Sequence, residues 1–122
     1  MKTVAVIGAS NNRRKFGNIA VRAFRHAGYK VIPITPAEQE VEGLRAFASV
    51  LEVPESIDMA TVYVPPHIGE RVIAEIAEKG IAEVWLNPGA ESERLLAKAR
   101  TLGIRPITAC SIVGIGLSPS QF

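Results

Sequence analysis

Short apolar runs alternate with segments of helical periodicity along the whole chain, and this alternation limits the fold more than any other feature. The first run, TVAVIG at residues 3–8, is rich in β-branched residues and ends in glycine, as is typical of a strand buried on both faces. From Gly17 onward the apolar residues recur at helical spacing until Gly28, where a helix end is expected. The same order repeats to the end of the chain and predicts an α/β protein with a parallel sheet.

We expect strands at residues 3–8, 30–34, 57–64, 83–86 and 104–108, and helices at residues 17–27, 47–51, 68–79 and 91–102. Short connections and right-handed crossovers favour a Rossmann-like, doubly wound five-stranded sheet of order 3-2-1-4-5 in a three-layer α/β/α arrangement. Residues 1–122 are expected to form a single domain. The apolar tail that begins at Cys110 must be covered by the sheet end or by a partner chain, and a homodimer is one way to cover it.

Composition narrows the class of protein. The 122 residues are 48% hydrophobic and 21% charged, as in a globular domain, and the net charge of +2 does not indicate a nucleic acid or membrane partner. No apolar stretch approaches the roughly 20 residues that span a bilayer. Cys110 is the only cysteine, so no internal disulfide can form. These features predict a soluble, cytoplasmic protein.

The loop after the first strand is the best candidate for a binding site. Ligands of open α/β sheets lie beyond the carboxyl ends of the strands where the strand order reverses, here expected between strands one and four. Gly8, Ala9 and Ser10 are small enough to let the backbone approach a ligand, and the next helix offers free N–H donors to an anion. A basic run, Arg-Arg-Lys at residues 13–15, follows. This combination favours a phosphate-binding loop, and a tight turn beside a solvated basic surface is the alternative.

The same loop disfavours a dinucleotide such as NAD. The fingerprint G-x-G-x-x-G would need glycines where Ser10 and Arg13 stand. The second strand also ends in Ile-Thr-Pro at residues 34–36 without the acid that binds ribose hydroxyls, and Glu38 follows only beyond the proline. NADP could use the basic loop but would meet the same missing glycines.

Candidates for chemistry are few. Cys110 follows the last strand with no histidine nearby in the sequence to activate it, so a structural thiol is the simpler interpretation. The two histidines, His26 and His67, are expected at helix ends on the surface. There is no Cys/His cluster for a metal and no G-x-S-x-G motif. The sequence predicts no catalytic residue and no metal ligand, and it favours a binding protein over an enzyme.

Five segments, in order along the chain, resemble the stand-alone CoA-binding domain proteins and the N-terminal domain of the succinyl-CoA synthetase α subunit. They are VAVIGAS (4–10), GYKVIPITP (28–36), VEG (41–43), VYVPP (62–66) and EKGIAEVWLNPGAESE (78–93). The resemblance implies coenzyme A as a non-covalent cofactor. It does not imply ligase activity, because the phosphorylated histidine of the synthetase belongs to a second domain without a counterpart in these residues.

The resemblance also implies a site. The CoA phosphates would lie on the loop after the first strand, the adenosine between the ends of the second and third strands, and the pantetheine near the end of the fourth. The residues so implied are Gly8, Ala9, Ser10, Asn12, Arg13, Lys15, Ile34, Thr35, Pro36, Val64, Pro65, Asn87 and Pro88.

Three functions are therefore open. The first is a binding or regulatory module for CoA or acyl-CoA without chemistry of its own. The second is an NAD(P)-binding Rossmann enzyme or redox sensor. The third is an interaction protein that uses the Rossmann fold as a scaffold and binds no nucleotide.

Overall fold

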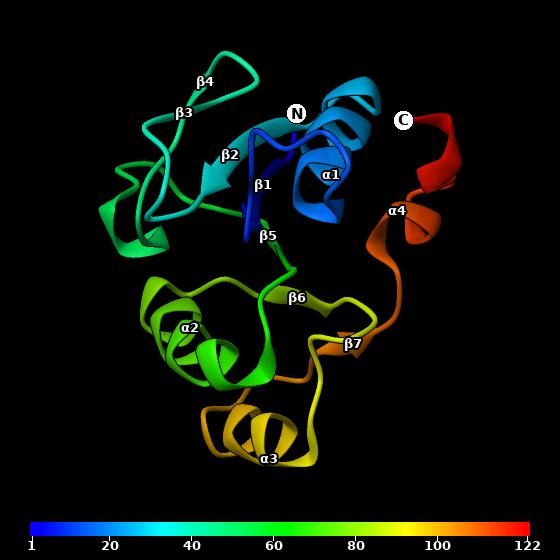
Figure 1. Ribbon diagram of the computed structural model, residues 1–122. Helices are drawn as coiled ribbons and strands as arrows, with labels where there is room; N and C mark the ends of the chain where they lie inside the picture. Colours follow the sequence, from blue (N-terminus) through cyan, green and yellow to red (C-terminus); the bar gives the residue numbers. More distant parts are fainter.

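A five-stranded parallel sheet forms the centre of the computed structural model, which describes residues 1–122 (Figure 1). Its strands are β1 (Thr3–Ile7), β2 (Lys30–Ile34), β5 (Met59–Val62), β6 (Glu83–Leu86) and β7 (Ile107–Thr108). The order across the sheet is β2-β1-β5-β6-β7, and every pair is parallel. The predicted parallel sheet and Rossmann-like fold are confirmed.

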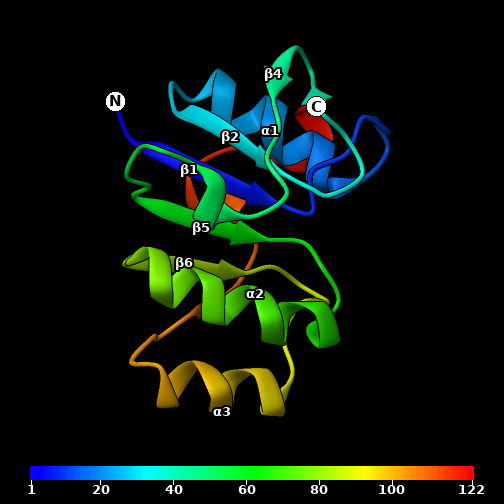
Figure 2. The ribbon, with the colours of Figure 1, turned by 90° about the vertical axis from the view of Figure 1, so that its left-hand side faces the viewer.

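Helices cover both faces of this sheet, so the predicted three layers are also confirmed (Figures 1 and 2). On one face lie α1 (Phe16–His26) and the short α4 (Ser111–Gly114); on the other lie α2 (Pro66–Lys79) and α3 (Glu93–Thr101). The remaining elements are a small hairpin, β3 (Glu40–Val41) and β4 (Leu44–Arg45), and two 3₁₀ helices, η1 (Val50–Glu52) and η2 (Pro119–Gln121).

The burial of β1 on both of its faces explains why its sequence is apolar throughout. Ala5 and Ile7 pack toward α2 and α3, whereas Val4 and Val6 pack toward α1, so both faces of the strand lie in a core. The tail is covered in part by its own chain: Ile112 of α4 is fully buried in the α1 core, whereas Val113 stays exposed.

The expected strand order 3-2-1-4-5 is wrong. The third strand of the sheet, β5, pairs with β1 and not with β2, which gives the order 2-1-3-4-5 in the same count. The outer edge of β2 is occupied instead by Phe47, which bridges to Ile34 and donates its N–H to the Pro33 carbonyl. Pro33 has no N–H of its own for a further strand, so it fits only an edge strand. The connection from β2 to β5 contains no α-helix, and it returns the chain to the other side of β1.

Some boundaries also differ from expectation. The predicted helix at 47–51 is only the 3₁₀ turn η1, and the last strand is shortened to β7. Helix α2 begins earlier, at Pro66, and α3 begins later, after Ser92, whose hydroxyl caps the N–H of Leu95. None of the helices has the length and apolar composition that crossing a lipid bilayer requires.

Candidate functional site

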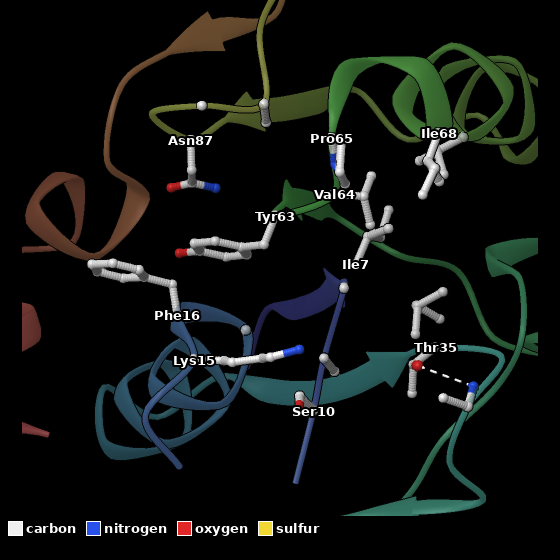
Figure 3. A pocket seen from close by; sticks show the side chains of 18 of the residues that line it. Ile7, Ser10, Lys15, Phe16, Thr35, Tyr63, Val64, Pro65, Ile68 and Asn87 are labelled. Carbon is white, nitrogen blue, oxygen red and sulfur yellow. Dashed lines mark hydrogen bonds between the residues drawn. The ribbon is translucent and has the colours of Figure 1, made fainter. Parts of the chain in front are cut away.

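A cavity of about 1100 Å³ opens at the carboxyl ends of the strands. The chain leaves β1 toward β2 and later returns to β5 on the other side of β1, so the strand order reverses between β1 and β5. The cavity lies at this reversal, where the rule for doubly wound sheets places ligands. The loops after β1, β2, β5 and β6 all contribute to its wall (Figure 3). The expected junction of strands one and four is thus corrected to the junction of β1 and β5.

Most residues of the implied site line this cavity. They are Gly8, Ala9, Ser10, Lys15, Ile34, Thr35, Pro36, Val64, Pro65, Asn87 and Pro88. Asn12 and Arg13 do not. The Asn12 side chain turns back to accept the N–H of Arg14, and the Arg13 guanidinium forms an ion pair with Glu42 at 3.3 Å. Arg14 lines the cavity in their place.

The free amide donors lie at Ser10 and, as expected, at the N-terminus of the next helix, whereas those of Gly8 and Ala9 are already used. The N–H groups of Gly8 and Ala9 both donate to the Ile34 carbonyl, at 3.0 and 3.3 Å. Those of Ser10, Phe16 and Gly17 have no hydrogen-bond partner in the protein. The Ser10 hydroxyl accepts from Asn12 N–H at 3.0 Å, which leaves its own hydrogen free to donate. The loop therefore presents Ser10 and the first turn of α1 to a ligand.

Two glycines bring these groups together. Gly8 has φ +94°, a conformation that side-chain-bearing residues rarely adopt, and it lies against the Tyr63 backbone. At Gly17 a Cβ atom would lie 2.0 Å from the Gly8 carbonyl oxygen. Gly17 thus allows the close helix–strand contact that the last glycine of the dinucleotide fingerprint provides. The spacing of the G-x-G-x-x-G fingerprint did not indicate this role for Gly17, because the loop between β1 and α1 is longer here.

Three cations face the cavity without an acidic partner: Arg14, Lys15 and Arg71. Lys15 extends between Ser10 and Tyr63 into the open space (Figure 3). Arg71 on α2 was not identified from the sequence, since nothing in a helical pattern shows which exposed arginine faces a ligand. Two acids, Glu38 and Glu75, also line the wall.

The cavity has one apolar end and one mixed end (Figure 3). Ile7, Val64 and Ile68 gather at the first, beside Pro65. The second end holds the aromatic rings of Phe16 and Tyr63, together with Asn87 (Figure 3). Cys110 lies near Tyr63, and Pro119 also lines the cavity. An elongated ligand with a charged middle and less polar ends fits this distribution.

Asn87 belongs to a buried polar network beneath the mixed end. Its amide nitrogen donates to the Thr61 hydroxyl at 2.7 Å and to the Val62 carbonyl at 3.0 Å, and its oxygen accepts the N–H of Ser111 at 2.9 Å. The Ser111 hydroxyl in turn contacts those of Thr61 and Tyr63. Both amide hydrogens of Asn87 are used inside the protein, so its main role is to fix the C-terminal segment against the sheet.

The Tyr63 phenol and the Cys110 thiol also line the cavity. Burial raises the pKa of the Tyr63 phenol, although its hydrogen bond to Ser111 acts in the opposite direction, so the phenol is neutral at physiological pH. Cys110 is half-buried and carries the only thiol. No group of three metal-ligating side chains occurs in the structure.

The family model of the CoA binding domain matches residues 2–115. The chain belongs to the CoA-binding domain family. The resemblance predicted from the sequence is thereby confirmed, and the matched region contains every residue of the cavity wall except Pro119 of the C-terminal tail.

Relatives of this CoA-binding domain include much longer proteins. An ADP-forming acetate–CoA ligase II from Archaeoglobus fulgidus is 36% identical over 116 residues, which are 85% of this chain and 17% of the ligase. The α subunit of an ADP-forming acetate–CoA ligase II from Pyrococcus furiosus is 38% identical over 82 residues, 66% of this chain and 18% of the subunit. The chain therefore spans less than a fifth of the length of these two relatives.

Solved structures show the same fold both alone and within a larger protein. A conserved hypothetical protein from Pyrococcus furiosus superposes with a TM-score of 0.87 and 35% identity, over 93% of this chain and 99% of that one. The apo form of a dinucleotide-forming acetyl-coenzyme A synthetase 1 from Ca. Korarchaeum cryptofilum gives a TM-score of 0.77 and 27% identity, over 88% of this chain and 26% of the synthetase.

Proposed function

We propose that the protein binds coenzyme A or an acyl-CoA in the cavity between β1 and β5 and acts as a binding or regulatory module. The observation that carries this proposal is the β1–α1 loop, which presents three unpartnered amides beside Arg14 and Lys15 in a member of the CoA-binding domain family. CoA carries a pyrophosphate and a 3′-phosphate, and anions of this kind suit helix N-termini and unpaired cations.

The proposed arrangement follows the shape of the cavity. The phosphates lie on Ser10 and the first turn of α1, near Lys15, and the adenosine lies toward the apolar end beside Thr35 and Val64. The pantetheine then extends toward Asn87 and Pro88. Because the chain covers only a small part of the ligases, we propose no ligase activity for it.

One feature favours an adenine dinucleotide as the competing ligand. Glu38, which the sequence placed beyond reach of the site, lines the cavity next to Pro36 and Ala37. A carboxylate in this region can bind ribose hydroxyls. NAD⁺ and NADPH are therefore the comparison ligands in the experiment that follows.

Isothermal titration with CoA, acetyl-CoA, NAD⁺ and NADPH tests the proposal. Wild-type protein should bind CoA or acetyl-CoA more tightly than either dinucleotide. Lys15→Ala should weaken CoA binding by about ten- to hundredfold, because a charge-assisted contact contributes about 1.5–3 kcal/mol. Lys2→Ala is the matched control, since Lys2 directly precedes β1 at the amino ends of the strands, away from the cavity, and lines no part of it. Tighter binding of NAD⁺, or equal losses in the two variants, would reject the proposal.

We also propose a homodimer. The support is the apolar surface near the β7 edge, where Ile107 and Val113 remain 41% and 60% exposed. Light scattering coupled to size exclusion distinguishes the dimer from a monomer directly.

A further inference from the structure

The turn of the β3–β4 hairpin contains the only residue other than glycine with a positive φ angle. This residue is Glu42, at φ +50°, in the middle of the VEG segment. The left-handed conformation brings a side-chain-bearing residue's Cβ close to the backbone and is unfavourable without compensating contacts. The contacts of Glu42 therefore indicate which part of the protein compensates for this unfavourable conformation.

Every polar group of Glu42 contacts the β1–α1 loop or α1. Its Oε2 accepts from the Asn18 side chain at 3.1 Å, and its Oε1 accepts from the Arg13 guanidinium at 3.3 Å. Its backbone N–H donates to Asn11 Oδ1 at 3.3 Å, and its carbonyl accepts from the Arg25 guanidinium at 2.7 Å. The hairpin is thus tied to the loop from Asn11 to Arg13 through one residue.

Asn18 transmits this contact to the binding groups. It is fully buried, and the same side-chain nitrogen that donates to Glu42 also donates to the Ser10 carbonyl at 2.9 Å. Its oxygen accepts from Arg22 at 2.7 Å, so its orientation is fixed from both ends. Ser10 lines the cavity and its N–H has no partner in the protein, whereas Glu42 itself lies outside the cavity wall.

The charge of Glu42 agrees with this role. The Asn18 hydrogen bond, followed by the contact with Arg13, lowers the pKa of the Glu42 carboxyl. The side chain is therefore an anion at neutral pH, which strengthens its hydrogen bonds to Asn18 and Arg13.

We propose that Glu42 is a positioning residue for the anion-binding loop. It holds Ser10, through Asn18, and the segment before Lys15, through Asn11 and Arg13, in the conformation that receives the phosphates. This inference rests on the proposed function of the cavity. Without Glu42 the loop samples other conformations, and the apparent dissociation constant rises in inverse proportion to the competent fraction.

Glu42→Gly is the decisive variant, because it removes the carboxylate and at the same time relieves the strained backbone. Relief of strain offsets the lost contacts, so the midpoint of urea denaturation should change little. The dissociation constant for CoA should nevertheless rise about tenfold, which corresponds to a competent fraction of roughly one tenth. Glu42→Gln keeps an acceptor for Asn18 and should recover part of the loss.

Glu40→Ala is the matched control. Glu40 lies in the same hairpin and its removal changes the net charge by the same amount, but its side chain makes no hydrogen bond or ion pair. Long-range attraction of an anionic ligand is therefore altered equally in both variants. Equal CoA affinity of Glu42→Gly and Glu40→Ala would overturn the inference.

Hydrogen exchange in the ligand-free protein separates this inference from the proposed function. The N–H groups of Asn12 and Arg14 are protected by bonds within the loop, both at 3.0 Å. Their exchange should be faster in Glu42→Gly than in the wild type and unchanged in Glu40→Ala. If the wild type bound no CoA, the proposed function would fail alone, and unchanged exchange in Glu42→Gly would refute the positioning role independently.

Discussion

The substitution Gly17→Ala tests the geometry of the site most sharply. A Cβ at this position would lie 2.0 Å from the Gly8 oxygen, 2.9 Å from the Gly8 carbonyl carbon and 3.3 Å from the Ala9 Cα. All three atoms belong to the backbone, so no side chain can turn aside. Since real Cβ contacts essentially never fall under 3.0 Å, α1 and the loop after β1 must separate by about 1 Å, the shortfall at the closest contact.

Two opposing effects determine the magnitude. Replacing glycine by alanine within a helix stabilises it by about 0.5–1 kcal/mol. Overpacking a buried site destabilises by about 1–3 kcal/mol, and more where backbone must move. We therefore expect Gly17→Ala to lower the free energy of unfolding by about 2 kcal/mol. We also expect CoA affinity to fall at least about tenfold, because a misplacement near 1 Å is enough to disrupt a preorganised site.

Urea denaturation and calorimetric titration measure the two quantities. Gly69→Ala is the matched control, because Gly69 is also buried in the first turn of a helix, but its Cβ would meet only the flexible end of Leu95 at 3.0 Å. This variant should stay within about 1 kcal/mol of the wild type. A Gly17→Ala protein that is more stable than the wild type and binds CoA normally would refute the reasoning.

Two other perturbations address the mixed end of the cavity. Asn87→Ala should lower the free energy of unfolding by about 2–4 kcal/mol, because it leaves the buried Ser111 N–H and Thr61 hydroxyl short of a partner. A loss below about 1 kcal/mol in urea denaturation would contradict the role of Asn87 in the buried network. Cys110 lines the cavity and carries the only thiol, so saturating acetyl-CoA, which has no free thiol, should slow its alkylation by iodoacetamide as followed by intact mass. An unchanged alkylation rate would place the acyl-pantetheine elsewhere.

The sequence predicted the sheet well because its strands carry their own signals. The run TVAVIG has both faces buried, and the glycines at 8 and 28 adopt the positive φ angles that end an element. The strand order failed for a reason that no local pattern contains. Where the chain turns after β2 depends on the contact of Phe47 with the β2 edge, a tertiary interaction of a residue that was expected to lie in a helix.

The sequence predicted where the candidate site lies better than it predicted which groups would contact a ligand there. Small residues after β1 indicated the loop, but the sequence does not show that the Gly8 and Ala9 amides already donate to Ile34. Which of three consecutive basic residues faces the cavity also depends on a distant partner, since Glu42 draws Arg13 away. Gly17 contributes through a close helix–strand contact, and Arg71 through its position on the cavity wall; spacing along the chain reveals neither.

The central claim is that the first turn of α1 and Ser10 receive the phosphates of CoA. Amide chemical shifts recorded during titration of labelled protein with CoA test it residue by residue. The largest changes should occur at Ser10, Phe16 and Gly17, while the amides of Gly80 and Gly103, at the far ends of α2 and α3, stay unchanged. Changes confined to residues outside the β1–α1 loop, or none at saturating CoA, would contradict the claim.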